Sequence, residues 1–388
     1  METHTEYSRL LQPPRSTFFL FGPRGTGKST WARSRLPGAM RFDLLDERLY
    51  QSLLADPGLF GDRLRTATAG SWVWVDEIQR LPNLLNEVHR FSEERRLKFA
   101  LTGSSARQLR RAGVNLLGGR AVTRTMYPFL PEELGGDFDL ESALRFGMIP
   151  IVFASEDRDE TLRAYVETYL KEEIQAEALV RNLPGFARFL PVAGLFHGQV
   201  LNTAGLSRDA GVARTTVEGF LGILEDTLLA FRLPAFEGRL RVREKRHPKL
   251  YWIDPGLARA VSRHTGPVSP EERGRQLEGW VASLLRAYGD LERLFDEMFY
   301  WAPADAARTE VDFLLRKGSR FIAIEVKSSR RLSAEDFRGL RAIDGLKGLS
   351  RRILVAPVSE ARRTEDGIDV VAPLGLIEAV RAASASRS

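Results

Sequence analysis

The feature that most constrains this chain is an apolar run, residues 17–21, that breaks into the pattern Gly-x-x-x-x-Gly-Lys-Ser. The run predicts a buried strand, and the glycines let the next residues curl so that backbone N–H groups converge on an anion. A helix that begins near Gly27 adds its positive dipole end, Lys28 reaches the outer phosphates, and the Ser29 hydroxyl is a Mg²⁺ ligand. The expected nucleotide-binding residues are Gly22, Pro23, Arg24, Gly25, Thr26, Gly27, Lys28, Ser29 and Thr30. The alternative is an ordinary glycine-rich turn.

Composition narrows the class of protein. Of 388 residues, 43% are apolar and 28% are charged, which is typical of a soluble globular protein with two or three domains. The lack of cysteine excludes disulfides, thiolate zinc sites and cysteine nucleophiles, and it fits a reducing cytoplasm. We find neither an apolar stretch of about eighteen residues nor a basic-then-apolar N-terminus, and therefore expect a cytoplasmic protein that does not enter a membrane. The net charge of +6 permits nucleic-acid binding without arguing for it.

Two later strands are expected to deliver polar side chains beside the loop. Four apolar residues lead into Asp76 and Glu77, a pattern in which the first acid holds the Mg²⁺ shell and the second polarises the attacking water. The alternative is an acidic helix start after a strand. The predicted strand 97–101 leads to hydroxyl groups at Thr102 and Ser104, which either sense the γ-phosphate or cap a helix. Because ligands of open parallel sheets bind beyond the strands' carboxyl ends, we predict one shared site.

These motifs resemble the AAA-type branch of P-loop ATPases, in which a Glu follows the second motif's Asp and a sensor strand lies between the two motif strands. A GTPase would have an Asn-Lys-x-Asp motif, which we do not find. The resemblance implies catalytic roles for Lys28, Glu77, Thr102 and Arg120, with ATP bound at the loop and Mg²⁺ at Ser29 and Asp76. It also implies a homo-oligomeric ring, expected to be hexameric, in which a neighbour's arginine completes the site. Arg110 and Arg111 compete with Arg120 for that role, and a solvated surface arginine is the alternative.

A helix-turn-helix is predicted at residues 206–224. Gly211 lies at the turn between two short helices, and apolar residues follow at helical spacing. Glu218 faces outward with the first residues of the second helix, although Ala213 stands where many such motifs have a capping Ser. The run 228–233 and the basic stretch 238–246 resemble two strands of a wing that could track a phosphate backbone. The residues expected to contact DNA are Arg214, Thr215, Arg239, Arg241 and Arg243. The alternative is a winged helix that binds a protein.

The end of the chain predicts a helix at 272–288 and strands at 298–302, 310–315 and 321–327. The two-residue repeat of a strand puts Glu325 and Lys327 on one face, and Asp312 lies on the neighbouring strand. This order resembles the PD-(D/E)xK nuclease core. The resemblance implies that the two acids hold Mg²⁺, that the lysine orients or activates water, and that Glu278 is the helix-borne acid of the family. The alternatives are a scaffold kept only for binding and a surface Glu/Lys pair.

Nearly the whole chain resembles a widespread prokaryotic ATPase family whose C-terminal half was long a domain of unknown function. Besides the loop, its landmarks are Trp-Val-Asp-Glu, Leu-Thr-Gly-Ser-Ser, Lys-Leu-Tyr-Trp-Ile-Asp-Pro-Gly-Leu at 249–257, Glu-Val-Asp-Phe and Ile-Glu-Val-Lys. The expected fold class is α/β: a P-loop ATPase parallel sheet (1–130), a helical and winged-helix middle (131–265) and a restriction-nuclease-like α/β end (266–388). The predicted function is a Mg²⁺-dependent ATPase that couples hydrolysis to DNA binding, translocation or remodelling. The alternative is an ATP-driven signalling or defence switch whose C-terminal half binds a protein partner.

Overall fold

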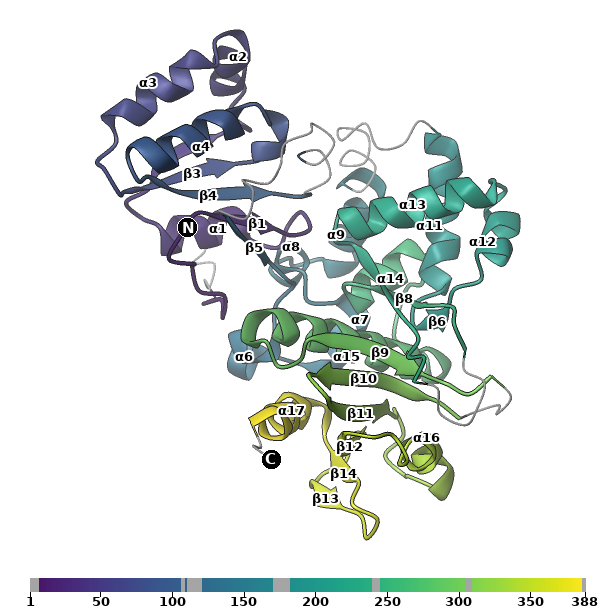
Figure 1. Cartoon of the computed structure of the whole chain (residues 1–388). Helices are drawn as coiled ribbons and strands as arrows, with labels where there is room; N and C mark the ends of the chain where they lie inside the picture. Colours follow the sequence, from purple (N-terminus) through teal and green to yellow (C-terminus); the bar gives the residue numbers. More distant parts are fainter. Residues whose placement is uncertain are drawn as a thin grey trace.

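A computed structural model describes residues 7–105, 109, 121–169, 182–238, 245–304 and 309–385. It shows three parts in chain order: a parallel sheet with its helices, a mainly helical middle, and a mixed sheet with helices at the end (Figure 1). The predicted α/β class, with these three kinds of structure in this order, is confirmed. Among the described helices, none is both long and apolar enough to cross a membrane.

The first sheet has the strand order β2-β3-β4-β1-β5, and all its neighbours are parallel. Strand β4 therefore lies between β3 and β1, as the resemblance implied. Alternate residues of β1 face opposite sides: Phe19 and Phe21 pack with helices α2 to α4, whereas Phe18 and Leu20 pack with Trp31 of α1. The elements are β1 (Phe18–Phe21), α1 (Lys28–Arg35), β2 (Met40–Asp43), α2 (Glu47–Ala55), α3 (Gly58–Thr66), β3 (Trp72–Asp76), a 3₁₀ turn (Ile78–Arg80), α4 (Leu84–Glu94), β4 (Lys98–Gly103) and β5 (Val122–Thr125).

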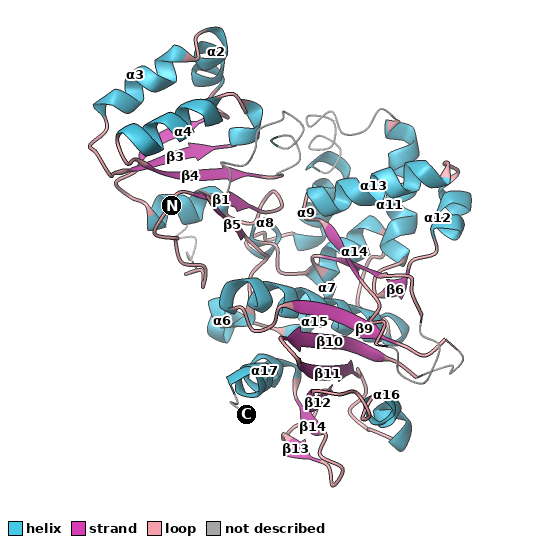
Figure 2. Ribbon diagram, viewed as in Figure 1, coloured by secondary structure: helices cyan, strands magenta, loops and turns pink. Residues whose placement is uncertain are grey.

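The middle part is mainly helical (Figure 2). It also contains a small antiparallel sheet of order β6-β8-β7. Strand β7 pairs with β8, so the second strand of this hairpin is not the basic stretch that we predicted. The arginines of 238–246 alternate like those of a half-exposed strand, whereas β8 uses the later segment Lys249–Trp252, which is buried throughout. The elements are α6 (Pro131–Leu134), α7 (Leu140–Phe146), α8 (Pro150–Phe153), α9 (Arg158–Ala164), a π-helical turn η4 (Tyr165–Tyr169), α11 (Leu183–Leu195), β6 (Gln199–Val200), α12 (Thr203–Ala210), α13 (Arg214–Asp226), β7 (Ala230–Leu233), β8 (Lys249–Trp252) and α14 (Pro255–Val261).

The last part is a six-stranded mixed sheet of order β13-β14-β12-β11-β10-β9. Helices α15 and α17 pack on one face and α16 on the other (Figure 1). A capping box begins α15, because Ser269 and Glu272 each accept the other's backbone N–H. The elements are α15 (Pro270–Glu292), β9 (Glu297–Trp301), β10 (Val311–Lys317), β11 (Arg320–Val326), a 3₁₀ turn (Ala334–Phe337), α16 (Arg338–Ala342), β12 (Leu349–Val355), β13 (Arg362–Arg363), β14 (Asp369–Val371) and α17 (Leu376–Ala385).

Helix α15 also joins the middle and last parts, because its apolar residues share one buried cluster with both. The close approach depends on Gly279. A Cβ at this position would lie 1.8 Å from Nε2 of His197, which is fully buried beside β8. His197 Nδ1 accepts the backbone N–H of Trp252 at 3.1 Å, and burial lowers the pKa of His197 to about 3. A neutral imidazole thus fills the space between α15 and β8.

Candidate functional site

The glycine-rich loop runs from the end of β1 to the start of α1. A Cβ at Gly22 would lie 2.5 Å from the carbonyl oxygen of Met126, and Gly27 takes a left-handed conformation (φ 84°) as it begins the helix. The Thr26 hydroxyl donates to the Pro23 carbonyl at 2.7 Å and closes the curl of the loop. The loop thus has the glycine-dependent close packing that a phosphate cradle requires.

Lys28 lies within this curl and is 6% exposed. Its ammonium donates to the carbonyl oxygens of Gly22 (2.7 Å) and Pro23 (3.1 Å). Arg24, Gly25, Ser29 and Thr30 complete the same segment, with Ser29 and Thr30 in the first turn of α1. A positive charge at a helix N-terminus, inside a loop of backbone N–H groups, fits the β- and γ-phosphates of a nucleotide.

Strands β3 and β4 bring Asp76 and Thr102 together, as the sequence predicted. The Thr102 hydroxyl donates to Asp76 Oδ1 at 2.5 Å, and it accepts the indole N–H of Trp74 at 2.9 Å. Asp76 is 1% exposed. Because Gly103 of β4 pairs with Phe21 of β1, this pair lies at the sheet edge from which the glycine-rich loop leaves.

Glu77 follows Asp76 in a left-handed conformation (φ 57°), so the backbone leaves the extended conformation of the strand at this residue. The Gln79 amide donates both to Glu77 and, at 3.1 Å, to the hydroxyl of Ser104. Gln79 therefore links the predicted catalytic base to the end of β4. We did not predict a role for Gln79, although it lies only two residues beyond Glu77.

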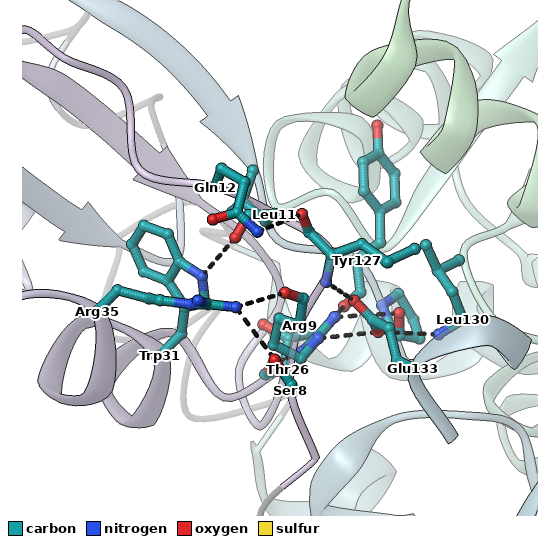
Figure 3. Close-up of polar contacts among 12 residues, drawn as sticks. Ser8, Arg9, Leu11, Gln12, Thr26, Trp31, Arg35, Tyr127, Leu130 and Glu133 are labelled. Carbon is teal, nitrogen blue, oxygen red and sulfur yellow. Dashed lines mark hydrogen bonds and ion pairs between the residues drawn. The ribbon is translucent and has the colours of Figure 1, made fainter. Parts of the chain in front are cut away.

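A buried ion pair fastens the N-terminal segment to this loop (Figure 3). Arg9 Nε lies 2.9 Å from Glu133 Oε2, and the same guanidinium donates to the carbonyls of Thr26 (2.8 Å) and Tyr127 (2.6 Å). Glu133 in turn accepts the backbone N–H groups of Leu10 and Leu130, at 2.8 and 3.0 Å. The pair therefore fixes the loop relative to the exit from the sheet.

A cavity of about 580 Å³ lies beside the start of α1. The rings of Tyr7, Phe129 and Phe153 line it and meet edge to face, with centroids 5.4 to 5.7 Å apart. Its lining also includes Arg9, Gly27, Thr30, Trp31, Arg35 and Pro150. Aromatic walls next to a phosphate loop suit a nucleobase.

The middle part touches the loop directly. The hydroxyl of Tyr165 donates to the Arg24 carbonyl at 2.8 Å, and the backbone N–H of Ile151 donates to the Gly25 carbonyl at 3.2 Å. A Cβ at Gly25 would lie 2.6 Å from the Ile151 side chain. A change in the conformation of the loop would therefore alter its hydrogen bonds to α8 and η4, which two backbone carbonyls of the loop accept.

Helices α12 and α13 meet at Gly211 (φ 62°), and Arg214 and Thr215 are exposed at the start of α13. No side chain caps α13 at Ala213, as expected. Glu218 is also exposed, and it lies 3.0 Å from Arg232 of β7. The arginines predicted at 110, 111, 120, 239, 241 and 243 lie outside the described residues.

The four C-terminal candidates lie close together, but they are joined by residues that we did not predict. Lys327 contacts Glu325 at 2.5 Å, and Asp312 accepts the backbone N–H of Val326 at 2.8 Å. Glu278 accepts from Lys249 at 2.8 Å and from the Tyr251 hydroxyl at 2.5 Å. Lys249 also contacts Glu310 and Asp312.

Burial dominates the electrostatics of this cluster. Burial and the Asp312 carboxylate raise the pKa of Glu278 to about 7, and the same two causes raise the pKa of Glu325 above its ordinary value. Burial alone would lower the pKa of Lys249, but the surrounding carboxylates, Glu278 first, raise it. Period-two spacing puts Glu310 beside Asp312 and Lys249 beside Tyr251, so this signal was present in the sequence.

Three family models match successive stretches of the chain. An AAA domain model matches residues 14–135, and two domains of unknown function, DUF8612 and DUF4143, match residues 137–267 and 273–377. The uncharacterized protein Rv2008c of Mycobacterium tuberculosis is 24% identical over 315 residues, which are 79% of this chain and 69% of that protein.

Two solved structures show weak similarity. The ORC1 protein of Aeropyrum pernix, solved in complex with DNA, aligns over 65% of this chain and 87% of its own, with 16% identity and a TM-score of 0.26. A STAND protein of Pyrococcus horikoshii with a tetratricopeptide repeat sensor aligns over 72% of this chain and 44% of its own, with 16% identity and a TM-score of 0.21.

Proposed function

Because the chain begins with an AAA-type, ATP-hydrolysing P-loop domain and ends with a DUF4143 domain, we propose that it couples Mg²⁺-dependent ATP hydrolysis to DNA binding and remodelling as a ring of subunits. The observation that carries the ATPase part is the meeting of three elements at one sheet edge. Lys28 comes from the loop after β1, Asp76 from β3 and Thr102 from β4.

The residues divide the work of phosphoryl transfer. Lys28 and the loop N–H groups would bind the phosphates, and Ser29 and Asp76 would hold Mg²⁺, which supplies positive charge against the phosphate oxygens when bound. Glu77 would take a proton from the attacking water. The hydrogen bond from Thr102 orients Asp76, and the Gln79 amide orients Glu77. The aromatic cavity beside Gly27 would hold the base.

Paired variants test these roles. We expect Lys28→Ala to abolish binding of a fluorescent ATP analogue, whereas Glu77→Gln binds it and loses turnover, because binding phosphate and activating water use different groups. Glu360→Gln, an exposed acid in the last part of the chain, is the matched control and should keep both properties. Equal loss of nucleotide binding in Lys28→Ala and Glu77→Gln would remove Glu77 from the catalytic role.

The DNA part of the proposal is supported by α12 and α13. A winged helix would use such a turn at Gly211 and a small sheet like β6-β8-β7. Arg214 and Thr215 are exposed at the start of α13, where such a helix would meet DNA. The basic stretch between β7 and β8 would supply phosphate contacts through Arg239, Arg241 and Arg243.

One observation favours the second candidate, a signalling or defence switch whose ATP-driven assembly is read by a protein partner. Glu218 lies one turn after Arg214 on the exposed side of α13, and an acid at this place would be repelled by DNA phosphates. Stimulation of ATP turnover by DNA separates the two candidates.

A further inference from the structure

Lys249 is a buried lysine that crosses from the middle part of the chain into the acidic cluster of the last part. It belongs to β8 and is only 3% exposed. Its ammonium lies 2.8 Å from Glu278 Oε1 and 3.5 Å from Asp312 Oδ1, and it contacts Glu310. Carboxylate oxygens of these three acids lie within 4.8 Å of one another, which is a spacing that could hold a metal ion.

The position of this ammonium is fixed from both sides. Tyr251, two residues further along β8, donates its hydroxyl to the same oxygen of Glu278. Helix α15, which carries Glu278, is held against β8 where Gly279 contacts His197. Lys249 and Glu278 are therefore brought together where β8 docks on α15.

The chemistry of the donors also fits an ammonium. Lysine carries three N–H donors, and here it has three carboxylate partners. Mg²⁺ requires oxygen ligands at about 2.0–2.1 Å in octahedral geometry, and at these acids it would meet a positive charge that already contacts their oxygens. The nuclease resemblance implied Mg²⁺ at Asp312 and Glu325, and the triad shares only Asp312 with that pair. The residues at the triad thus do not fit a Mg²⁺ ion.

We propose that the Lys249 ammonium is the built-in cation of the Glu278–Glu310–Asp312 triad and closes this site to divalent metal while β8 is docked on α15. The ion pairs between Lys249 and the triad then connect the middle and last parts of the chain. This inference stands apart from the proposed ATPase, since it concerns other residues and needs no nucleotide.

Manganese binding to the full chain tests the proposal. The measurement is the electron paramagnetic resonance signal of Mn²⁺ without nucleotide, in an Asp76→Asn background that removes the acid expected to bind metal at the ATP site. While Lys249 is present, the triad should bind no Mn²⁺. Adding Asp312→Asn should therefore leave the amount of bound Mn²⁺ unchanged. Lys249→Met should bind Mn²⁺ about tenfold more tightly or better, because a nearby positive charge has been removed. Lys245→Met, an exposed lysine on the same segment, is the matched control and should change nothing.

Thermal unfolding keeps the proposal testable if Lys249→Met folds poorly. Mn²⁺ should raise the melting temperature of Lys249→Met but not that of the parent, and Lys249→Arg, which keeps the charge, should gain no Mn²⁺ site. The double variant Lys249→Met/Glu278→Gln, with one carboxylate fewer, should fold better than Lys249→Met and bind Mn²⁺ more weakly. Mn²⁺ bound through Asp312 in the presence of Lys249 would overturn the proposal. A Lys249→Met chain that Mn²⁺ neither binds nor stabilises would overturn it equally.

Discussion

The buried pair of Arg9 and Glu133 gives a prediction whose size follows from the structure. Each residue is 8% exposed, and the pair joins segments 124 positions apart in the chain. In Arg9→Met, Glu133 keeps two backbone N–H donors but loses its positive partner, so a buried carboxylate remains unpaired. Removing one partner of a buried ion pair costs about 3–5 kcal/mol of folding free energy.

The assay is a double-mutant cycle read by urea unfolding. We expect Arg9→Met and Glu133→Gln each to cost about 3–5 kcal/mol. The double variant should cost less than their sum by about 2–3 kcal/mol, because neither residue is then left as a lone buried charge. Both single variants should also weaken binding of an ATP analogue, since Arg9 holds the Thr26 carbonyl of the loop.

The exposed pair of Arg65 and Asp62 is the control. Their side chains are 58% and 63% exposed, so the same cycle should give a coupling below about 1 kcal/mol. If the Arg9 and Glu133 variants add within about 0.5 kcal/mol, the two residues do not stabilise the fold as a pair and the reasoning is wrong.

Three further predictions follow from other contacts. Tyr165→Phe removes the hydroxyl that donates to the Arg24 carbonyl, and fluorescence titration should show ATP binding weakened by about three- to tenfold with the fold intact. Unchanged affinity would mean that the contact from η4 does not contribute to nucleotide binding. Burial raises the pKa of Asp254 from 3.8 to about 6, so this group's contribution to the free energy of unfolding should fall by about 3 kcal/mol as the pH rises through this range. Asp254→Asn should remove that part of the pH dependence of the unfolding free energy measured in urea. An identical pH dependence in the variant would refute the prediction. If Arg120 acts in trans, Arg120→Ala subunits should bind ATP and regain some turnover when mixed with Lys28→Ala subunits, whereas no mixture would recover if the arginine acts within its own subunit.

The parts of the site that the sequence predicted are those set by local pattern. The loop, the acids after β3 and the hydroxyls after β4 were predictable because strand alternation and glycine spacing determine them within a few residues. Their meeting followed from a general property of parallel sheets, whose carboxyl ends share one edge. The hydrogen bond between Thr102 and Asp76 is seen only in the structure, because the two residues belong to different motifs.

The contacts that the sequence did not predict join distant segments. Nothing local to Arg9 indicates that Glu133 is its partner, and Lys249 meets Glu278 only because β8 docks on α15. The predicted second wing strand failed for a different reason. Alternating arginines imitate a half-exposed strand, whereas β8 is buried at all four positions, Lys249 included, and so lacks the alternation of exposed and buried residues that we used to predict the wing.

The most direct test of the central claim is ATP turnover by the full chain, measured with and without duplex, single-stranded and branched DNA. We predict that at least one DNA raises turnover and that the rise depends on salt, because phosphate contacts release counterions. Arg214→Ala should reduce the DNA effect while basal turnover persists, and Glu77→Gln should abolish turnover under all conditions. If no DNA changes ATP turnover, and Arg214→Ala behaves like the parent chain, the coupling to DNA is contradicted. That result would favour a switch that binds a protein partner.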